Sequence, residues 1–266
     1  MASSSSAGPR FPSTLAPAAY YEGLPDRIKH DLLPVVSRYL AAPATHHVLE
    51  LSAGTGLHAL IYARHHPHLI IQPTECDDYN CKRIDQTCQS ALDMAGPGGE
   101  GVRGHVKRAI RLDVVEREGW EDLQYSLEEG KSGKATEGNE ASEVFDLVLG
   151  SNFFHMIPFP DGPRAIFVNL LHFNLVSRIH GQLLIYGPFK SDHGFFSAAD
   201  EDFDKAISSR PSPWPLGLRS IDALARIANE LGWTLKERIE MPKGNWVLVF
   251  EVKNAGTART GAEVPQ

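Results

Sequence analysis

HVLELSAGTGLHAL (residues 47–60) joins a short apolar run to a glycine-rich turn and then to a second apolar run. The turn fits the G-x-G-x-x-G/A pattern, in which Gly54 and Gly56 allow a tight bend between a buried strand over 47–51 and a helix over 57–66. Glycines let a ligand approach the backbone closely, and the unpaired N–H groups at a helix N-terminus attract an anion. The stretch therefore predicts a strand–turn–helix unit that binds a cofactor.

Segments of strand and helix length alternate along the rest of the chain. The further strands are expected at 69–74, 105–114, 144–150, 182–186, 234–240 and 246–252. The further helices are expected at 26–40, 78–94, 163–177 and 221–231, with a kink or break at Pro34. This alternation predicts an α/β, Rossmann-like domain with a mostly parallel seven-stranded sheet and an antiparallel edge strand.

One domain is expected over residues 20–253. Residues 1–19 and 254–266 are poor in large apolar side chains, so both are predicted to be disordered tails. Residues 128–143 are polar and glycine-rich and are predicted to be a flexible acidic insertion. They belong to a longer acidic loop expected over 116–143, with nine acidic and three basic residues.

Composition narrows the function classes. The chain has 266 residues, a formal charge of −7 and 42% hydrophobic residues, which is typical of a globular protein. Its apolar runs are far shorter than the roughly 20 residues of a membrane helix, so no membrane association is expected. No basic stripe is visible, so nucleic acid is not an expected partner.

The three cysteines point to a reducing compartment. Cys76, Cys81 and Cys88 are spaced by 5 and 7 positions, which matches neither zinc nor redox motifs, so no metal site is expected. The N-terminal residues lack the apolar core of a secretory signal. A cytoplasmic location is expected.

Three carboxylates help to choose the cofactor. Glu75 lies 21 residues after Gly54, where it can accept both hydroxyls of a ribose. Glu50 precedes the glycine turn, where it can lie near a positively charged amino acid group, and Asp113 ends the third strand, where an adenine amino group can donate to it. This set favours S-adenosylmethionine (SAM), with NAD as the alternative, and a purely structural glycine turn stays open as well.

A family resemblance supports SAM. VLELSAGTGLHALIYARHHPHLIIQPTECD (48–77), SNFFHMIPF (151–159), LLIYGPFK (183–190), the 197–224 segment and MPKGNWVLVFE (241–251) follow one another in order. Together they resemble a family of small SAM-dependent methyltransferase-like proteins. That family includes mammalian methyltransferase-like protein 26 and bacterial proteins known only by a domain of unknown function.

The resemblance implies a class I methyltransferase fold. Glu50, Gly54 and Gly56 would frame the methionine end of SAM, Glu75 would bind the ribose and Asp113 the adenine. Asn152 would follow the fourth strand beneath the cofactor, and the neighbouring Ala53 and Val114 complete the cofactor set. Two departures stand out: the family's Arg-Asn pair before the first helix is replaced within residues 20–27, and its aspartate at strand two is Glu75 here.

His155 is the candidate general base. It follows the fourth strand at the edge where open α/β sheets bind ligands, and a base is needed if the methyl acceptor is a hydroxyl. The alternative is a histidine hydrogen-bonded into the loop that shapes the pocket. An O-methyl acceptor fits a histidine base best.

Five further residues are candidates for substrate binding. Tyr186 and Phe189 end the fifth strand at the same edge and could line the pocket, and for Tyr186 the alternative is a residue packed in the strand. Asn245 lies in the turn between the last strands, where turn chemistry alone would explain it. Tyr20 and Tyr21 could cap the site or only dock on the domain.

The sequence thus predicts a SAM-dependent methyltransferase acting on a small-molecule acceptor. A non-catalytic methyltransferase-like binding module and an NAD-dependent oxidoreductase remain as alternatives.

Overall fold

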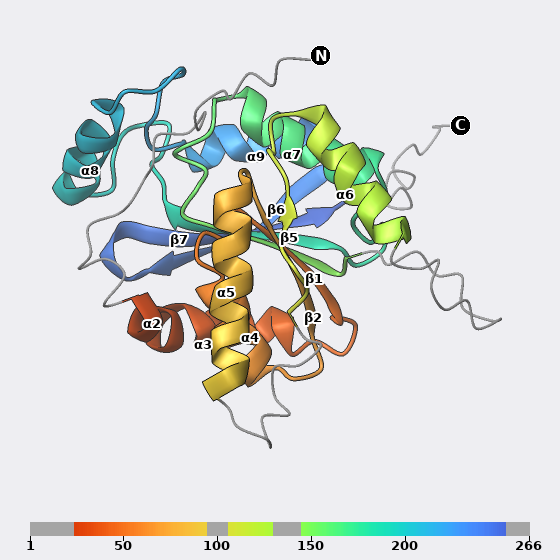
Figure 1. Ribbon diagram of the computed structural model, residues 1–266. Coiled ribbons are helices and arrows are strands. Elements are labelled where there is room, and N and C mark those ends of the chain that lie inside the picture. The colour runs from red at the N-terminus through yellow and green to blue at the C-terminus, as the bar shows by residue number, and fades with distance from the viewer. Residues whose placement is uncertain (1–23, 95–105, 130–144, 254–266) are drawn as a thin grey trace, which may run out of the picture.

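A computed structural model describes residues 24–94, 106–129 and 145–253. The strands in these ranges form one seven-stranded sheet (Figure 1). The strand order is β3-β2-β1-β4-β5-β7-β6. All neighbouring strands are parallel except that β7 runs antiparallel to both β5 and β6, which confirms the expected sheet. The strands are β1 (His47–Leu51), β2 (Ile70–Glu75), β3 (Ile110–Arg111), β4 (Leu147–Ser151), β5 (Gln182–Pro188), β6 (Trp233–Met241) and β7 (Asn245–Val252).

Helices cover both faces of the sheet (Figure 1). One face carries α2 (Leu24–Arg27), η1 (Ile28–Leu32), α3 (Leu33–Leu40), α4 (Leu57–His65) and α5 (Asp78–Met94). The other carries α6 (Arg117–Glu129), α7 (Asp161–His172) and α9 (Ile221–Glu230), and α8 (Ala198–Ser208) projects beyond the sheet. No helix within these ranges is long and apolar enough to cross a membrane.

Each face of the sheet has its own hydrophobic core. Trp120, Phe167 and Trp233 are fully buried between the sheet and α6, α7 and α9. Leu40 and Tyr62 are buried on the opposite face. The inner strands are apolar on both faces because helices cover both, as expected for a mostly parallel sheet.

The segment around Pro34 shows how the first helix tolerates a proline. Pro34 lies in the first turn of α3, and the preceding turn η1 is π-helical. In a regular helix the Pro34 ring would clash with the carbonyl of His30, and the wider turn relieves that conflict. The helical path continues there without a break, so α2, η1 and α3 follow one another directly.

Three expected elements differ from the sequence prediction. The strand predicted at 105–114 is reduced to β3 and a bridge at Val106, because Pro73 in β2 has no N–H and the Gln72 amide donates to Arg108 O instead. The helix predicted over 163–177 ends at His172, since Asn174 is left-handed. The loop predicted from 116 begins with α6, an amphipathic helix that buries Trp120.

The expectations for the two tails fall on residues 1–19 and 254–266, outside the described ranges. Nearly all of the 128–143 insertion lies outside them too, and so do Tyr20 and Tyr21.

Candidate cofactor and substrate site

The chain reverses its course across the sheet between β1 and β4, which are adjacent and whose carboxyl ends lie side by side. The crevice at such a switch point is where open α/β sheets bind ligands. The glycine turn after β1 and Asn152 after β4 both lie at this point.

The glycine turn is shaped by two left-handed residues with different roles. Gly56 (φ +75°) precedes α4, and a Cβ there would lie 2.9 Å from Cγ2 of Ile84 on α5. Gly54 (φ +62°) is exposed, and a Cβ there would meet nothing within 4 Å. Buried Ala53 ties the turn to β2 by donating its N–H to Thr74 O at 2.9 Å. Gly56 therefore serves packing, whereas Gly54 leaves open space beside the backbone.

Two buried carboxylates lie beside the turn. Glu50 is 2% exposed, and burial, reinforced by the negative charge of Glu75, raises its pKa to about 8. Burial likewise raises the pKa of Glu75 to about 7, against hydrogen bonds from the Ser52 hydroxyl and the Gly54 N–H. Within the described residues, Oε2 of Glu50 and Oε2 of Glu75 accept no hydrogen bond. Both oxygens therefore lack the hydrogen bond that a buried carboxylate oxygen normally accepts.

Asp113 lies close to the end of β2. Asp113 follows β3 and is 8% exposed. Its Oδ1 accepts a hydrogen bond from the Val115 N–H at 3.1 Å. The neighbouring Val114 is also buried. Burial raises the pKa of the Cys76 thiol, and the negative charges of Glu75, Asp77 and Asp113 raise it further. Glu75 and Asp113 therefore both lie near this thiol, which directly follows β2. The fold thus brings Glu75 and Asp113 to one end of the site.

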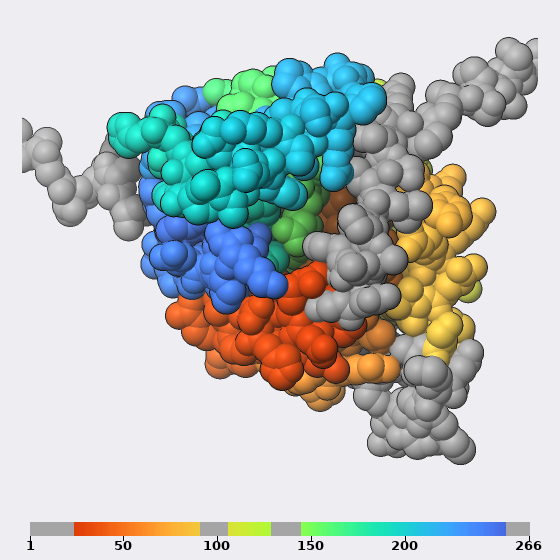
Figure 2. All heavy atoms as spheres, turned by 90° about the vertical axis from the view of Figure 1, so that its left-hand side faces the viewer, coloured from red at the N-terminus to blue at the C-terminus, as the bar shows by residue number. Residues whose placement is uncertain are grey.

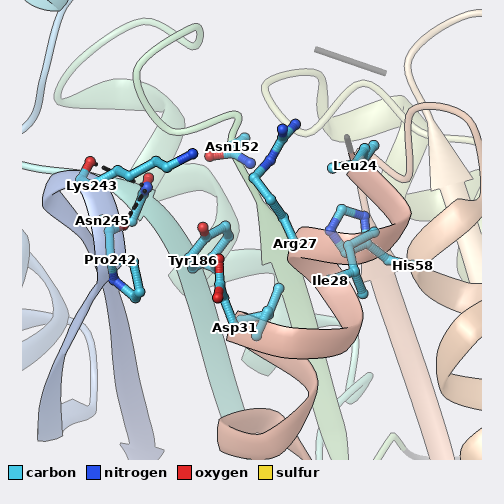
Figure 3. Close-up of a pocket in the computed structure, with 11 residues that line it drawn as sticks. Leu24, Arg27, Ile28, Asp31, His58, Asn152, Tyr186, Pro242, Lys243 and Asn245 are labelled. Carbon is cyan, nitrogen blue, oxygen red and sulfur yellow. Dashed lines mark hydrogen bonds between the residues drawn. The ribbon is translucent and has the colours of Figure 1, made fainter. Parts of the chain in front are cut away.

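A cavity of about 260 Å³ opens between the N-terminal helices, the ends of β4 and β5 and the β6–β7 turn. Figure 2 shows it as a hollow between the red N-terminal helices, the blue turn and the teal segment around α8. Figure 3 shows the side chains that enter it. It is lined by Leu24, Arg27, Ile28, Asp31, Leu32, His58, Asn152, Tyr186, Pro242, Lys243 and Asn245.

The floor of the cavity comes from the strand ends. Asn152 adopts a left-handed conformation (φ 56°) directly after β4, and its N–H donates to Tyr186 O at 2.8 Å. His58 enters from the first turn of α4, and burial lowers its pKa to about 4, so its imidazole is neutral at pH 7. The floor thus offers amide, phenol and neutral imidazole groups.

The β6–β7 turn forms one wall. Asn245 lines the cavity, and its Nδ2 donates to the carbonyl oxygens of Pro242 (3.1 Å) and Lys243 (3.4 Å). Asn245 therefore stabilises the turn and also borders the cavity.

The family model of a protein of unknown function, DUF938, matches residues 20–252, nearly all of the described chain. This chain belongs to the DUF938 family. The match agrees with the resemblance to a family known by a domain of unknown function.

Solved structures similar to this DUF938 protein share its fold. An O-methyltransferase family protein from Burkholderia thailandensis is 15% identical, with a TM-score of 0.59 over 88% of this chain and 60% of that one. CalO1, a methyltransferase in calicheamicin biosynthesis solved with S-adenosylhomocysteine (SAH), is 17% identical, with a TM-score of 0.57 over 90% and 57%. A SAM-dependent methyltransferase from Aquifex aeolicus is 11% identical, with a TM-score of 0.54 over 87% and 96%.

These likenesses confirm the class I methyltransferase fold for this DUF938 protein. The chain spans about three fifths of the length of the first two relatives.

Among the described candidates for catalysis and substrate binding in the DUF938 chain, Tyr186 and Asn245 line the cavity, whereas His155 and Phe189 do not. His155 is 8% exposed, its ring packs edge-on against Phe203, and its carbonyl accepts the Gly217 N–H. Burial and the nearby Arg219 and Arg210 lower its pKa to about 4. Phe189 is 1% exposed within the core between the sheet and α6, α7 and α9. The contacts of His155 are those of the loop histidine that is its structural alternative, and its catalytic role stays a prediction. Phe189 packs in the core and not in the cavity wall, which corrects that expectation.

Four charged or titratable residues at the cavity were missed by sequence reasoning. Arg27 and Asp31 come from the N-terminal helices, His58 from α4 and Lys243 from the β6–β7 turn. His58 had a local signal, because it lies two residues after Gly56 in the glycine turn. The other three reach the cavity only through long-range packing.

Among the described residues, no group of three or more histidine, cysteine or acidic side chains is arranged to hold a metal ion.

Proposed function

We propose that this DUF938 protein is a SAM-dependent methyltransferase that acts on a small-molecule acceptor. The observation that carries the proposal is the pair of buried carboxylates, Glu50 and Glu75, each with an oxygen that accepts no hydrogen bond from the described chain, beside the open backbone at Gly54. Buried polar atoms are nearly always hydrogen-bonded in native proteins, so such a pair indicates a ligand that completes it.

The residues present fit SAM. Glu75 would accept hydrogen bonds from the ribose hydroxyls, and Asp113 would accept one from the adenine amino group. Glu50 would face the ammonium group of the methionine part, and the turn at Ala53–Gly56 would leave room for its backbone. Asn152 and Val114 complete this set. Bound SAM supplies a methyl group that its sulfonium already activates.

The chain itself has to orient the acceptor and exclude water. The apolar side chains of Leu24, Ile28 and Leu32 line one side of the cavity, opposite the polar floor. The neutral imidazole of His58 can accept a hydrogen bond from an acceptor hydroxyl, and Tyr186 can hold the same group. O-methylation is therefore the reaction that we propose.

Proteins with the same fold support the proposal of a methyltransferase. Solved structures with the same fold include proteins described as O-methyltransferases and one bound to SAH. We also propose kinship with methyltransferase-like protein 26, on the motifs quoted above. Cytoplasmic location remains a proposal, which the three free thiols support.

Calorimetric titration with SAM, SAH and NAD tests the cofactor. We expect SAM and SAH to bind and NAD not to bind. Glu75→Gln removes one acceptor oxygen and should weaken SAH binding by at least about tenfold, because a hydrogen bond to a charged group contributes about 1.5–3 kcal/mol. Glu118→Gln, at an exposed position on α6, is the matched control and should bind SAH as the wild type does.

Each other outcome has a defined meaning. Binding of NAD alone would replace the proposal with an NAD-dependent oxidoreductase. A folded protein that binds none of the three would favour the non-catalytic binding module. Equal SAH affinity of the Glu75→Gln variant and the wild type would remove Glu75 from the cofactor site.

A further inference from the structure

The cavity carries more positive charge than the protein around it. The whole chain has a formal charge of −7, yet the charged residues lining the cavity are Arg27, Lys243 and Asp31, two cations and one anion. His58 stays neutral because burial lowers its pKa to about 4. In an acidic protein, a cavity whose charged side chains have a net positive charge favours an anionic ligand.

The two cations come from opposite walls. Arg27 enters from α2 and Lys243 from the β6–β7 turn, and in Figure 3 both side chains extend toward Asn152 at the end of β4. Arg27 is half-buried, whereas Lys243 is exposed at the mouth. An anionic group over Asn152 would therefore lie between a cation of the helix and a cation of the turn.

The backbone at Lys243 is held in an uncommon conformation. Lys243 has φ 62° and ψ 40°, in the left-handed region that costs a lysine about 1 kcal/mol or more. Only Ser52, Asn152 and Asn174 share a positive φ among the non-glycine residues of the described chain. Asn152 lines the same cavity, so two of the four such residues border it.

A buried contact supports the turn from behind. Gly244 is left-handed (φ +71°), and a Cβ there would lie 2.2 Å from Oδ1 of Asp200. Asp200 is 4% exposed in the first turn of α8, so its carboxylate packs directly on the turn backbone. Together with the Asn245 hydrogen bonds, this contact fixes where the Lys243 side chain starts.

We infer that the methyl acceptor carries a carboxylate or a similar anionic group and that Lys243 recognises it. This inference rests on the proposed function. Lys243 acts as a specificity-determining residue, since its ammonium donates a charge-assisted hydrogen bond to the acceptor and takes no part in methyl transfer. The same chemistry exists on SAM, whose methionine part also has a carboxylate, so the test has to separate the two sources.

Benzoate and benzamide are suitable probes, because they match in size and differ in charge. Each is titrated by calorimetry into the protein alone and into the protein saturated with SAH. We expect benzoate to bind at least about tenfold more tightly than benzamide, the ratio that corresponds to one charge-assisted hydrogen bond. Lys243→Gln should abolish the preference and leave the SAH affinity unchanged.

Lys29→Gln is the matched control. Lys29 is an exposed cation of η1 that does not line the cavity, so its removal changes the net charge equally and should keep the benzoate preference. Circular dichroism of each variant checks that the fold is intact.

Several results would overturn the inference. They are equal affinity for both probes, no binding of either probe, or a benzoate preference that survives in Lys243→Gln. A loss of SAH affinity in Lys243→Gln with benzoate binding unchanged would assign Lys243 to the cofactor carboxylate instead. If SAH does not bind while Lys243-dependent benzoate binding persists, the methyltransferase proposal fails and the anion site stands.

Discussion

Glu50 places a carboxylate inside β1, where burial and the charge of Glu75 raise its pKa to about 8. In the unfolded chain this group has its ordinary pKa of about 4.5. Between these values the native state binds more protons than the unfolded state, so stability falls as the pH rises from about 4.5 to 8. Glu50 is therefore a residue that the fold retains at a cost in stability.

Glu50→Gln should stabilise the ligand-free protein at pH 8.5 and leave its stability almost unchanged at pH 4.5. Glutamine stays neutral, so the variant avoids the cost of an ionised buried carboxylate, which is about 1.4 kcal/mol for each unit of pKa shift. Thermal unfolding at the two pH values measures the difference. Glu118→Gln should show neither effect, and an equal gain at both pH values would contradict the assigned cause.

The β6–β7 turn shows how an element, more than any one side chain, builds the cavity wall. Its position depends on left-handed backbone at Lys243 and Gly244, on the Asn245 hydrogen bonds, and on the Asp200 carboxylate behind it. Because Asp200 belongs to α8, the wall joins two segments that are distant in the sequence.

Gly244→Ala should displace the turn, because its Cβ would clash with Asp200 and an alanine in the left-handed region costs about 1–2 kcal/mol. We expect benzoate binding to fall by about tenfold or more, with SAH affinity retained. Gly194→Ala is the control, since an alanine at φ +137° would also be strained but its Cβ would meet nothing within 4 Å. Unchanged benzoate binding in Gly244→Ala would show that the turn does not form the anion site.

At the scale of the whole molecule, the core between the sheet and α6, α7 and α9 contributes no side chain to the cavity lining. Trp233 begins β6, is fully buried, and donates its Nε1–H to Phe167 O on α7 at 3.0 Å. It does not line the cavity, although its strand leads to the turn that does.

Trp233→Phe should lower the free energy of unfolding by about 1–3 kcal/mol, through the smaller ring and the lost hydrogen bond from Nε1–H to Phe167 O. Urea denaturation measures it, and SAH affinity should be unchanged. Trp214→Phe removes a similar hydrogen bond, to Met156 O, from a half-buried ring and should cost less. A weakened SAH affinity in Trp233→Phe would show that core and site are coupled.

Local patterns were enough to predict the main elements. The β1–turn–α4 unit, α5 over 78–94 and the antiparallel pair β6–β7 follow from apolar periodicity and turn residues, which act over a few positions. The carboxylates at the strand ends could be anticipated for the same reason, because parallel strands present their carboxyl ends at one edge of the sheet. Local patterns did not predict the structure where contacts between distant segments decide how long a strand is, as for β3, which is shorter than expected.

The sequence by itself thus determined the sheet, the glycine turn and the placing of Glu50 and Glu75 at the edge of the sheet where we propose that the cofactor binds. Only the tertiary structure decided which histidine borders the cavity, since His58 and His155 both follow strand ends yet only His58 reaches it. It also brought Arg27 and Lys243 to one cavity from positions more than 200 residues apart in the chain. The physical reason is that side-chain direction and long-range packing depend on the whole fold, whereas periodicity records only each segment's own buried face.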